Sequence, residues 1–378
     1  GKRMSSLRIA TWGIAGISAA LFFVKPEPIY LYLGLALLGA GAVIAEIANV
    51  TYYALLDDLA TPENVGRVSG FGWGLGYLGG IASLLILFFG FISEGNLLGL
   101  SDENGMNVRL AMVFCGLWTL LFTIPIFATI KDKPQPEKTN LPRQGILDAY
   151  KELFASIKRY WHRPNERHIV YFLVASALFR DGLAGVFTFG AIIAAGTFGL
   201  SASQVIVFGA ASNIVAGLST IAFGYLDDKL GPKTVIMISL GSLSVLAIVM
   251  FYFGRLSALK LITADESFRI FWIIGLLLTI FVGPAQAASR SYLARIAPEG
   301  HAGELFGLYV TTGRAVSLLS PALFGVAVYL GWLFTGRNET QYWGVLGIGV
   351  VLIAGALVMI PVKSPEQLAA HIEENETV

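Results

Sequence analysis

The chain is poor in charge, cysteine and histidine. Charged residues make up 13% of its 378 positions, and the formal net charge is +1. This balance does not indicate nucleic-acid binding, which needs a marked excess of Lys and Arg. The only cysteine, Cys115, excludes an internal disulfide and a cysteine metal cluster. None of the four histidines lies in the middle of an apolar segment, so no metal-dependent membrane enzyme is predicted.

Nucleotide-binding patterns are also missing. The segment Gly74-Leu75-Gly76-Tyr77-Leu78-Gly79 matches the dinucleotide pattern G-x-G-x-x-G in letters only, because no strand precedes it and it lies within an apolar run. Its glycines are better explained as small residues that let helices pack closely. No phosphate-binding loop is present, so ATP-driven work is not expected. No cofactor is predicted.

Long polar stretches are scarce, because ten apolar segments occupy most of the chain. Each is long enough to cross about 30 Å of hydrocarbon as a helix, which takes roughly 20 residues. They lie at about 7–24, 29–54, 68–92, 109–130, 169–196, 203–226, 234–254, 269–289, 304–330 and 341–361. The sequence therefore predicts an all-α, multi-pass membrane protein with the lipid bilayer as its solvent.

One polar linker, 131–168, divides these segments. It opens with the charged, proline-containing run Lys131–Pro136, which predicts a disordered stretch, and then places apolar residues at helical spacing from Ile146 to Trp161. The amphipathic helix would lie on the membrane surface or pack under the helical bundle. The linker is rich in Lys and Arg, which places it and both chain ends in the cytoplasm by the positive-inside rule.

The two halves resemble each other. Ala60, Gly66 and Gly70 recur as Ala297, Gly303 and Gly307 at a constant offset of 237 residues, and the same offset matches Asn49 with Gln286. A duplicated bundle with a cytoplasmic linker is typical of a two-lobed transporter whose site lies between the lobes. The predicted parts are an N-terminal lobe (1–130), the linker (131–168), a C-terminal six-helix lobe (169–362) and a cytoplasmic tail (363–378).

The loop Gly224-Tyr225-Leu226-Asp227-Asp228-Lys229-Leu230-Gly231-Pro232-Lys233 resembles the G-x-L-x-D-(R/K)-x-G-x-(R/K) loop of the major facilitator superfamily. In that superfamily the loop joins the second and third helices of each half. The chain opens with Gly1-Lys2-Arg3, which is similar to the end of the same motif. The resemblance implies two helices before residue 1, so that the ten segments would be helices three to twelve. A natural ten-helix protein is the alternative.

Three further blocks narrow the resemblance. They are Tyr52–Leu56 with Gly66–Gly70 and Gly74–Gly80, Phe179–Gly182, and Gly283–Ser291. Together they are similar to the branch that includes the fungal autophagy-related vacuolar amino-acid effluxer and its prokaryotic relatives. The resemblance implies secondary transport, without fixing the solute or the direction.

Ionisable residues inside apolar segments are costly and normally face a partner or a wet cavity. Four such residues stand out, namely Glu46, Arg180, Asp181 and Arg314. Two cations and two anions suit a zwitterionic solute such as an amino acid. A desolvated carboxylate titrates nearer neutrality, so Glu46 is the candidate carrier of a coupling proton or, alternatively, a packing residue bound to an arginine.

The superfamily resemblance places Glu46, Asn49, Tyr53, Arg180, Asp181 and Gln286 on cavity-lining helices. Neighbours on a helix point about 100° apart, so one of Arg180 and Asp181 is expected to face the cavity while the other binds another helix. Alternatively, both belong to a fixed network between helices. Asn49 and Gln286 would bind the solute from both lobes or form helix–helix hydrogen bonds.

The same resemblance places Asp228 against the start of the segment at 68–92, near Arg67, with Gly224 permitting close approach and Lys229 and Gly231 completing the motif. The positive helix N-terminus and Arg67 would both favour the Asp228 carboxylate. This contact would close the cytoplasmic side and break as the lobes rock. A solvated loop charge is the alternative.

The sequence thus predicts a monomeric secondary transporter, not an enzyme, that moves a small solute by alternating access with proton coupling. The plasma membrane is expected in a prokaryote, and a vacuolar or other internal membrane in a eukaryote. A transporter of a sugar, drug or lysolipid, a non-transporting receptor and a membrane-embedded enzyme remain alternatives.

Overall fold

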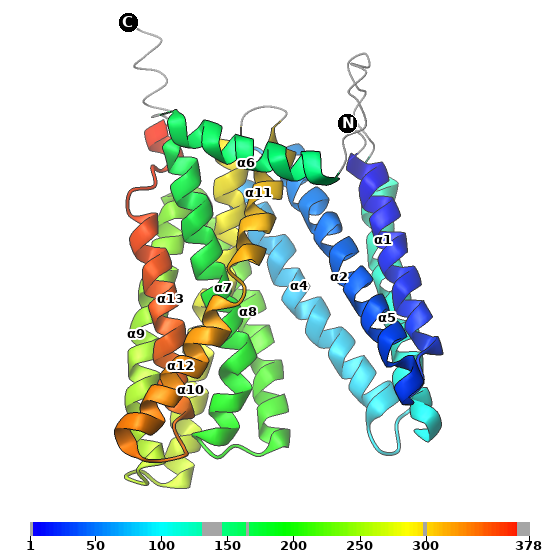
Figure 1. The fold of residues 1–378 in the computed structure, drawn as a ribbon, viewed down its shortest axis with the longest axis vertical. Helices are drawn as coiled ribbons and strands as arrows, with labels where there is room; N and C mark the ends of the chain where they lie inside the picture. Colours follow the sequence, from blue (N-terminus) through cyan, green and yellow to red (C-terminus); the bar gives the residue numbers. More distant parts are fainter. Residues whose placement is uncertain (1–2, 131–145, 164–165, 298–300, 369–378) are drawn as a thin grey trace, which may run out of the picture. The chain divides into compact units, whose positions relative to one another are not determined.

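The computed structural model describes residues 3–130, 146–163, 166–297 and 301–368, and within these it contains helices and no strand. The long helices are α1 (Arg3–Ala20), α2 (Leu31–Ala54), α4 (Val65–Leu87), α5 (Met106–Thr129), α6 (Ile146–His162), α7 (Arg167–Gly196), α8 (Ala202–Leu230), α9 (Pro232–Ala258), α10 (Ala264–Ile296), α11 (Ala302–Ala315), α12 (Leu319–Thr335) and α13 (Gly344–Met359), with a short α3 (Leu56–Leu59) (Figure 1). In lipid, a helix satisfies its backbone hydrogen bonds within one segment.

Ten candidate membrane spans are present among the described residues, counting α11 and α12 as one. The all-α membrane fold predicted from hydropathy is therefore confirmed. Large apolar side chains remain on the outside of these helices, for example Ile9, Tyr32 and Leu218, which are 74%, 81% and 57% exposed. Such exposure suits contact with acyl chains.

The chain forms two compact units. One comprises Gly1–Asp58 and Gly79–Gln144, and the other comprises Leu59–Leu78 and Gly145–Val378. Helix α4 is therefore shared, because its first part groups with the C-terminal helices and its remainder with the N-terminal ones. The lobe boundaries expected from the sequence remain a prediction.

The N-terminal unit is built from α1, α2 and α5. Helix α1 packs against both α2 and α5. At one end of the unit, Met4, Leu7 and Leu55 form a small buried cluster. The guanidinium of Arg3 donates to the carboxylate of Asp58 at 3.1 Å and to the Ala54 carbonyl at 3.3 Å, which joins the start of α1 to the end of α2.

The C-terminal unit is the more deeply packed of the two. Helix α7 lies against α13, and α10 lies against α8 and α9 (Figure 1). Its core is aromatic, with the Phe172 and Tyr292 rings stacked at a 4.2 Å centroid separation and both side chains fully buried. Helices α8 and α10 begin with capping boxes, Ser201 with Gln204 and Thr263 with Glu266, which satisfy the first backbone N–H groups.

The described end of the amphipathic helix α6 packs under the bundle. Ser156 and Tyr160 are 6% and 5% exposed, and Arg159 forms an ion pair with Glu304 of α11 at 2.8 Å. Two arrangements are expected for this helix, on the membrane surface or packed under the bundle, and the described residues fit the second. The predicted disordered run Lys131–Pro136 lies outside the described residues.

The sequence predicts one continuous helix over 304–330. This prediction is wrong in one respect, because the helix is interrupted. Helix α11 ends at Ala315 and α12 begins at Leu319. A break inside a membrane span exposes backbone groups that lipid cannot satisfy, so other parts of the protein must bind them. The Asp181 side chain of α7 binds one such group, the Ser320 N–H, as described below.

Candidate transport site and gating network

The carboxylate of Asp228, at the end of α8, binds the first turn of α4. It accepts hydrogen bonds from the Gly66 backbone N–H at 2.8 Å and from the Arg67 backbone N–H at 3.2 Å, and the Arg67 Nε donates to it at 2.8 Å. The contact expected between Asp228 and Arg67 is therefore present. An anion at a helix N-terminus is stabilised by the helix dipole and by unpaired backbone N–H groups.

The preceding acid, Asp227, binds a second partner helix. Its carboxylate, 2% exposed, accepts hydrogen bonds from Ser291 and from Arg295, both on α10. A second nitrogen of Arg295 donates to Asp228 at 3.1 Å, and its Nε donates to the Pro62 carbonyl at 3.1 Å. We call Gly66, Arg67, Asp227, Asp228, Ser291 and Arg295 the gating network. It ties α4 to α8 and α10 at one end of the C-terminal unit.

Sequence reasoning singled out Arg67 and Asp228 but missed Asp227, Ser291 and Arg295. The available signal was the pair of adjacent acids, since neighbours on a helix point about 100° apart and two such acids contact two different helices. Ser291 and Arg295 are four residues apart and so share one face of α10. Nothing in the local pattern states that this face meets α8.

Three other residues of the motif, Lys229, Gly231 and Gly224, lie outside the gating network. Lys229 is exposed, and Gly231 lies between α8 and α9 with φ of +78°, a backbone conformation that favours glycine. A Cβ at Gly224 would lie 2.9 Å from the Gly66 carbonyl oxygen. Glycine at 224 therefore permits the close approach of α8 to α4 that the motif predicted.

A second layer of contacts lies one turn further along α4. The Ser69 hydroxyl donates to the Ala287 carbonyl at 2.7 Å, and the guanidinium of Arg290 donates to the Ser69 carbonyl at 2.9 Å. Arg290, 4% exposed, also lies over the Trp73 ring at 4.7 Å. Trp73 thus packs against α10, and the buried arginine joins the two helices.

Arg180 and Asp181, adjacent on α7, bind α11 and the start of α12. Arg180 donates to the carbonyl of Tyr309, within α11, at 2.9 Å, and its guanidinium lies 3.7 Å from the centre of the Tyr309 ring. Asp181, 7% exposed, accepts a hydrogen bond from the Ser320 backbone N–H at 2.6 Å, in the first turn of α12. The Asp181 carboxylate complements the positive N-terminal end of α12.

These contacts bear on the two arrangements considered for Arg180 and Asp181. Both side chains bind α11 or α12, as in a fixed network between helices. Their role as solute ligands remains a prediction. The interruption at Val316–Leu318 has a local signal in Pro321, in the first turn of α12, because proline has no N–H to donate to the Ser317 carbonyl four residues earlier.

The remaining candidates are divided between the two units. In the N-terminal unit, Glu46 and Asn49 of α2 are half-buried and Tyr53 is 8% exposed. In the C-terminal unit, Gln286 of α10 is half-buried and Arg314 is exposed at the end of α11. A site shared by Asn49 and Gln286 therefore stays a prediction from the repeat. Within the described residues, no three His, Cys, Asp or Glu side chains are grouped as metal ligands would be.

Comparison with solved structures agrees with this architecture. The proton:xylose symporter XylE, bound to 6-bromo-6-deoxy-D-glucose, superposes with a TM-score of 0.67 and 16% identity over 97% of this chain and 83% of that one. A bacterial homologue of the iron transporter ferroportin, in its outward-facing state, superposes with a TM-score of 0.66 and 14% identity over 95% of this chain and 83% of that one. At these identities the likeness shows the fold, which is that of a major facilitator superfamily transporter.

Sequence relatives identify the branch. The family model for vacuole effluxer Atg22-like proteins matches residues 54–330, and the chain belongs to that family. The MFS-type transporter YxiO of Bacillus subtilis is 25% identical over 346 residues, or 90% of this chain and 74% of the relative. Autophagy-related protein 22-1 of Neosartorya fischeri is 23% identical over 273 residues, which span 69% of this chain and 43% of that protein. YxiO and both solved structures are transporters, so the chain is a transporter of this superfamily and not an enzyme.

Proposed function

We propose that the protein is a secondary active transporter that moves an amino acid or similar zwitterion by alternating access, driven by protons. The observation that carries the proposal is the gating network. It joins the first part of α4 to α8 and α10 within the C-terminal unit, while the rest of α4 belongs to the N-terminal unit. In alternating access, contacts at one face hold two lobes together and must break when that face opens.

The solute class rests on ionisable side chains within membrane spans. Glu46 and Arg314 lie in α2 and near the end of α11, each within a span. Such residues are retained at a cost of roughly 2.5 kcal/mol or more, which favours a functional role. A solute with both a carboxylate and an ammonium group matches a site with both signs of charge. The description of the family as vacuole effluxers and the resemblance to the fungal amino-acid effluxer agree with this class.

Proton coupling is assigned to Glu46. A carboxylate within a membrane span is costly to ionise, so it exchanges a proton as water gains and loses access during the cycle. The resulting flux is electrochemically driven, with the direction set by the gradient. A multi-pass protein of this kind would operate as a monomer, in the plasma membrane of a prokaryote or an internal membrane of a eukaryote, with both termini cytoplasmic.

The test is counterflow in proteoliposomes loaded with unlabelled amino acids, followed by uptake of the labelled ones. We expect saturable exchange of at least one amino acid, and accumulation when an imposed pH gradient is present. Replacing Glu46 with Gln should abolish gradient-driven accumulation while exchange at equal pH persists, since exchange needs no net proton movement. Glu94→Gln, in an exposed loop, is the matched control.

Two results would contradict the proposal. Absence of exchange for every amino acid would remove the zwitterion assignment. Undiminished accumulation in Glu46→Gln would remove the proton role of that residue while leaving the transport assignment intact.

A further inference from the structure

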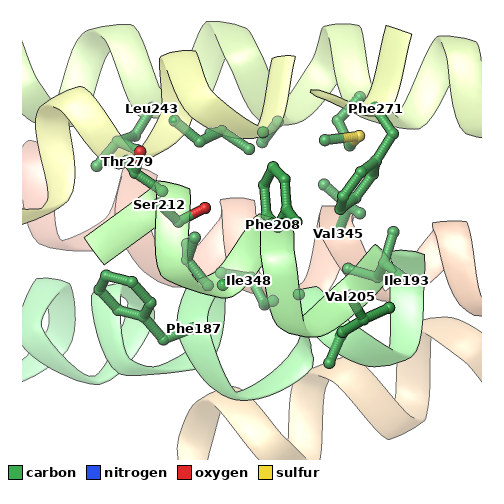
Figure 2. A pocket seen from close by; sticks show the side chains of 18 of the residues that line it. Phe187, Ile193, Val205, Phe208, Ser212, Leu243, Phe271, Thr279, Val345 and Ile348 are labelled. Carbon is green, nitrogen blue, oxygen red and sulfur yellow. The ribbon is translucent and has the colours of Figure 1, made fainter. Parts of the chain in front are cut away.

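A cavity of about 150 Å³ lies inside the C-terminal unit, apart from the gating network and from the Arg180–Asp181 pair. Five helices enclose it, namely α7, α8, α9, α10 and α13, and Figure 2 shows side chains from these helices around it. None of the residues proposed above as solute ligands lines it. The cavity therefore requires its own explanation.

The floor of the cavity is buried and apolar. On α9 and α13, Leu243, Met250 and Leu352 are 0%, 3% and 1% exposed, and Phe271 of α10 is 2% exposed. By contrast, lining residues on α7 and α8 are half-buried or exposed, including Gly190, Ala191 and Val205. Helices α7 and α8 also contact each other little, since α7 packs on α13 and α8 packs on α10. The opening therefore lies between α7 and α8.

One polar group is directed into this apolar space. The side chain of Ser212, 3% exposed, points its hydroxyl toward the ring of Phe208 (Figure 2). No hydrogen-bond partner for this hydroxyl exists among the described parts of the chain. A buried hydroxyl left unpaired costs free energy, so this group is poised to bind something that enters the cavity.

Two neighbouring polar side chains each donate a hydrogen bond within their own helix. The Thr279 hydroxyl donates to the Leu276 carbonyl at 2.8 Å, and the Asn213 amide donates to the Gly209 carbonyl at 2.8 Å. Among the residues that the structure describes, none that lines the cavity is charged. A charged occupant would lack a counter-charge in an apolar enclosure, which excludes ions and zwitterions as ligands.

We propose that this cavity binds a neutral, benzene-sized molecule that carries a single hydroxyl group, held by a hydrogen bond to Ser212. The volume supports the size, because an apolar cavity of about 150 Å³ in another protein accommodates benzene. The aromatic side chains Phe187, Phe208 and Phe271 supply ring surfaces for an aromatic ligand. The binding does not depend on the transport activity proposed above.

The test uses 3-fluorophenol and fluorobenzene as probes, observed by ¹⁹F NMR with the full chain in lipid nanodiscs. Saturable binding of 3-fluorophenol, displaced by unlabelled phenol, is expected. Partition into lipid alone is not saturable, so empty nanodiscs supply the baseline. Because one hydrogen bond contributes about 0.5–1.5 kcal/mol, Ser212→Ala should weaken the binding of 3-fluorophenol about two- to tenfold. The binding of fluorobenzene should not change.

Two further variants locate the binding. Ala191→Trp places a large side chain at the opening and should abolish binding of both probes. Ser244→Ala, on α9, removes a hydroxyl that donates to the Leu240 carbonyl of its own helix and should change neither. Non-saturable association, equal 3-fluorophenol affinity in Ser212→Ala, or unchanged binding in Ala191→Trp would each overturn the proposal. A cavity occupied only by water would give the first of these results.

Discussion

At the scale of single residues, two pairs of adjacent side chains each bind two different helices. Asp227 and Asp228 bind α10 and α4, while Arg180 and Asp181 bind α11 and the start of α12. In both pairs the rotation of about 100° per residue lets one short segment of helix hold two other elements. Buried charges placed this way are stabilised by hydrogen bonds that a lipid environment would not supply.

The contribution of Asp181 can be measured by removing its acceptor. Asp181→Ala leaves the Ser320 N–H without that partner inside a membrane span, which should lower the free energy of unfolding by about 1–3 kcal/mol. Asp181→Asn keeps a neutral acceptor oxygen and should cost about half as much. Thermal unfolding in detergent compares the two variants with the parent protein. Equal stability of Asp181→Ala and the parent would show that the break does not need this carboxylate.

At the scale of elements, the packing of α4 on α8 depends on the absence of side chains. A Cβ added at Gly70 would lie 2.7 Å from the Thr220 carbonyl oxygen and 2.9 Å from the Gly224 Cα. Both of these atoms are backbone, so α8 would have to move as a unit. Close backbone approach through small residues is a general means of helix association in membranes.

The chain offers a matched pair of glycines on α4 to test this packing. Gly70→Ala should separate α4 from α8 and destabilise the C-terminal unit by about 1–3 kcal/mol, as overpacking does. A Cβ at Gly76 would meet nothing within 4 Å, so Gly76→Ala should be neutral or stabilising by up to about 1 kcal/mol, because alanine favours helix. Thermal unfolding of both variants decides the matter, and equal destabilisation would contradict the close-approach explanation.

At the scale of the whole molecule, α4 is the helix that the two compact units share. The gating network is therefore expected to control the equilibrium between conformations. Its Arg295 and Asp228 side chains are 8% and 9% exposed, whereas Arg67 is 49% exposed. The Arg67 pair, screened by solvent, should contribute little, and most of the effect should come from the buried contacts.

We expect Asp228→Asn to shift that equilibrium toward a state in which α4 has left α8. Loss of charge-assisted hydrogen bonds to the Gly66 N–H and Arg295 should change the equilibrium constant about tenfold or more. The measurement is maleimide labelling of Val65→Cys, a position 3% exposed at the start of α4, in a Cys115→Ser background. Asp265→Asn, at the opposite end of α10, is the control. An unchanged labelling rate in Asp228→Asn would contradict the gating role.

The sequence by itself determined the class of this protein. Span length and hydropathy are local properties, and lipid leaves helices as the simplest solution, so the ten spans and their approximate bounds followed from composition. The motif around Asp228 also specified its contact with the start of α4, because that motif carries its own structural context.

The tertiary structure decided what local pattern could not. It placed Arg180 against α11 and Asp181 against the start of α12, and it recruited Ser291 and Arg295 to the gating network. Each of these depends on how a helix is rotated about its axis and which distant helix it meets. Packing between segments sets that rotation, and a uniformly apolar helix carries almost no periodic signal that would reveal it.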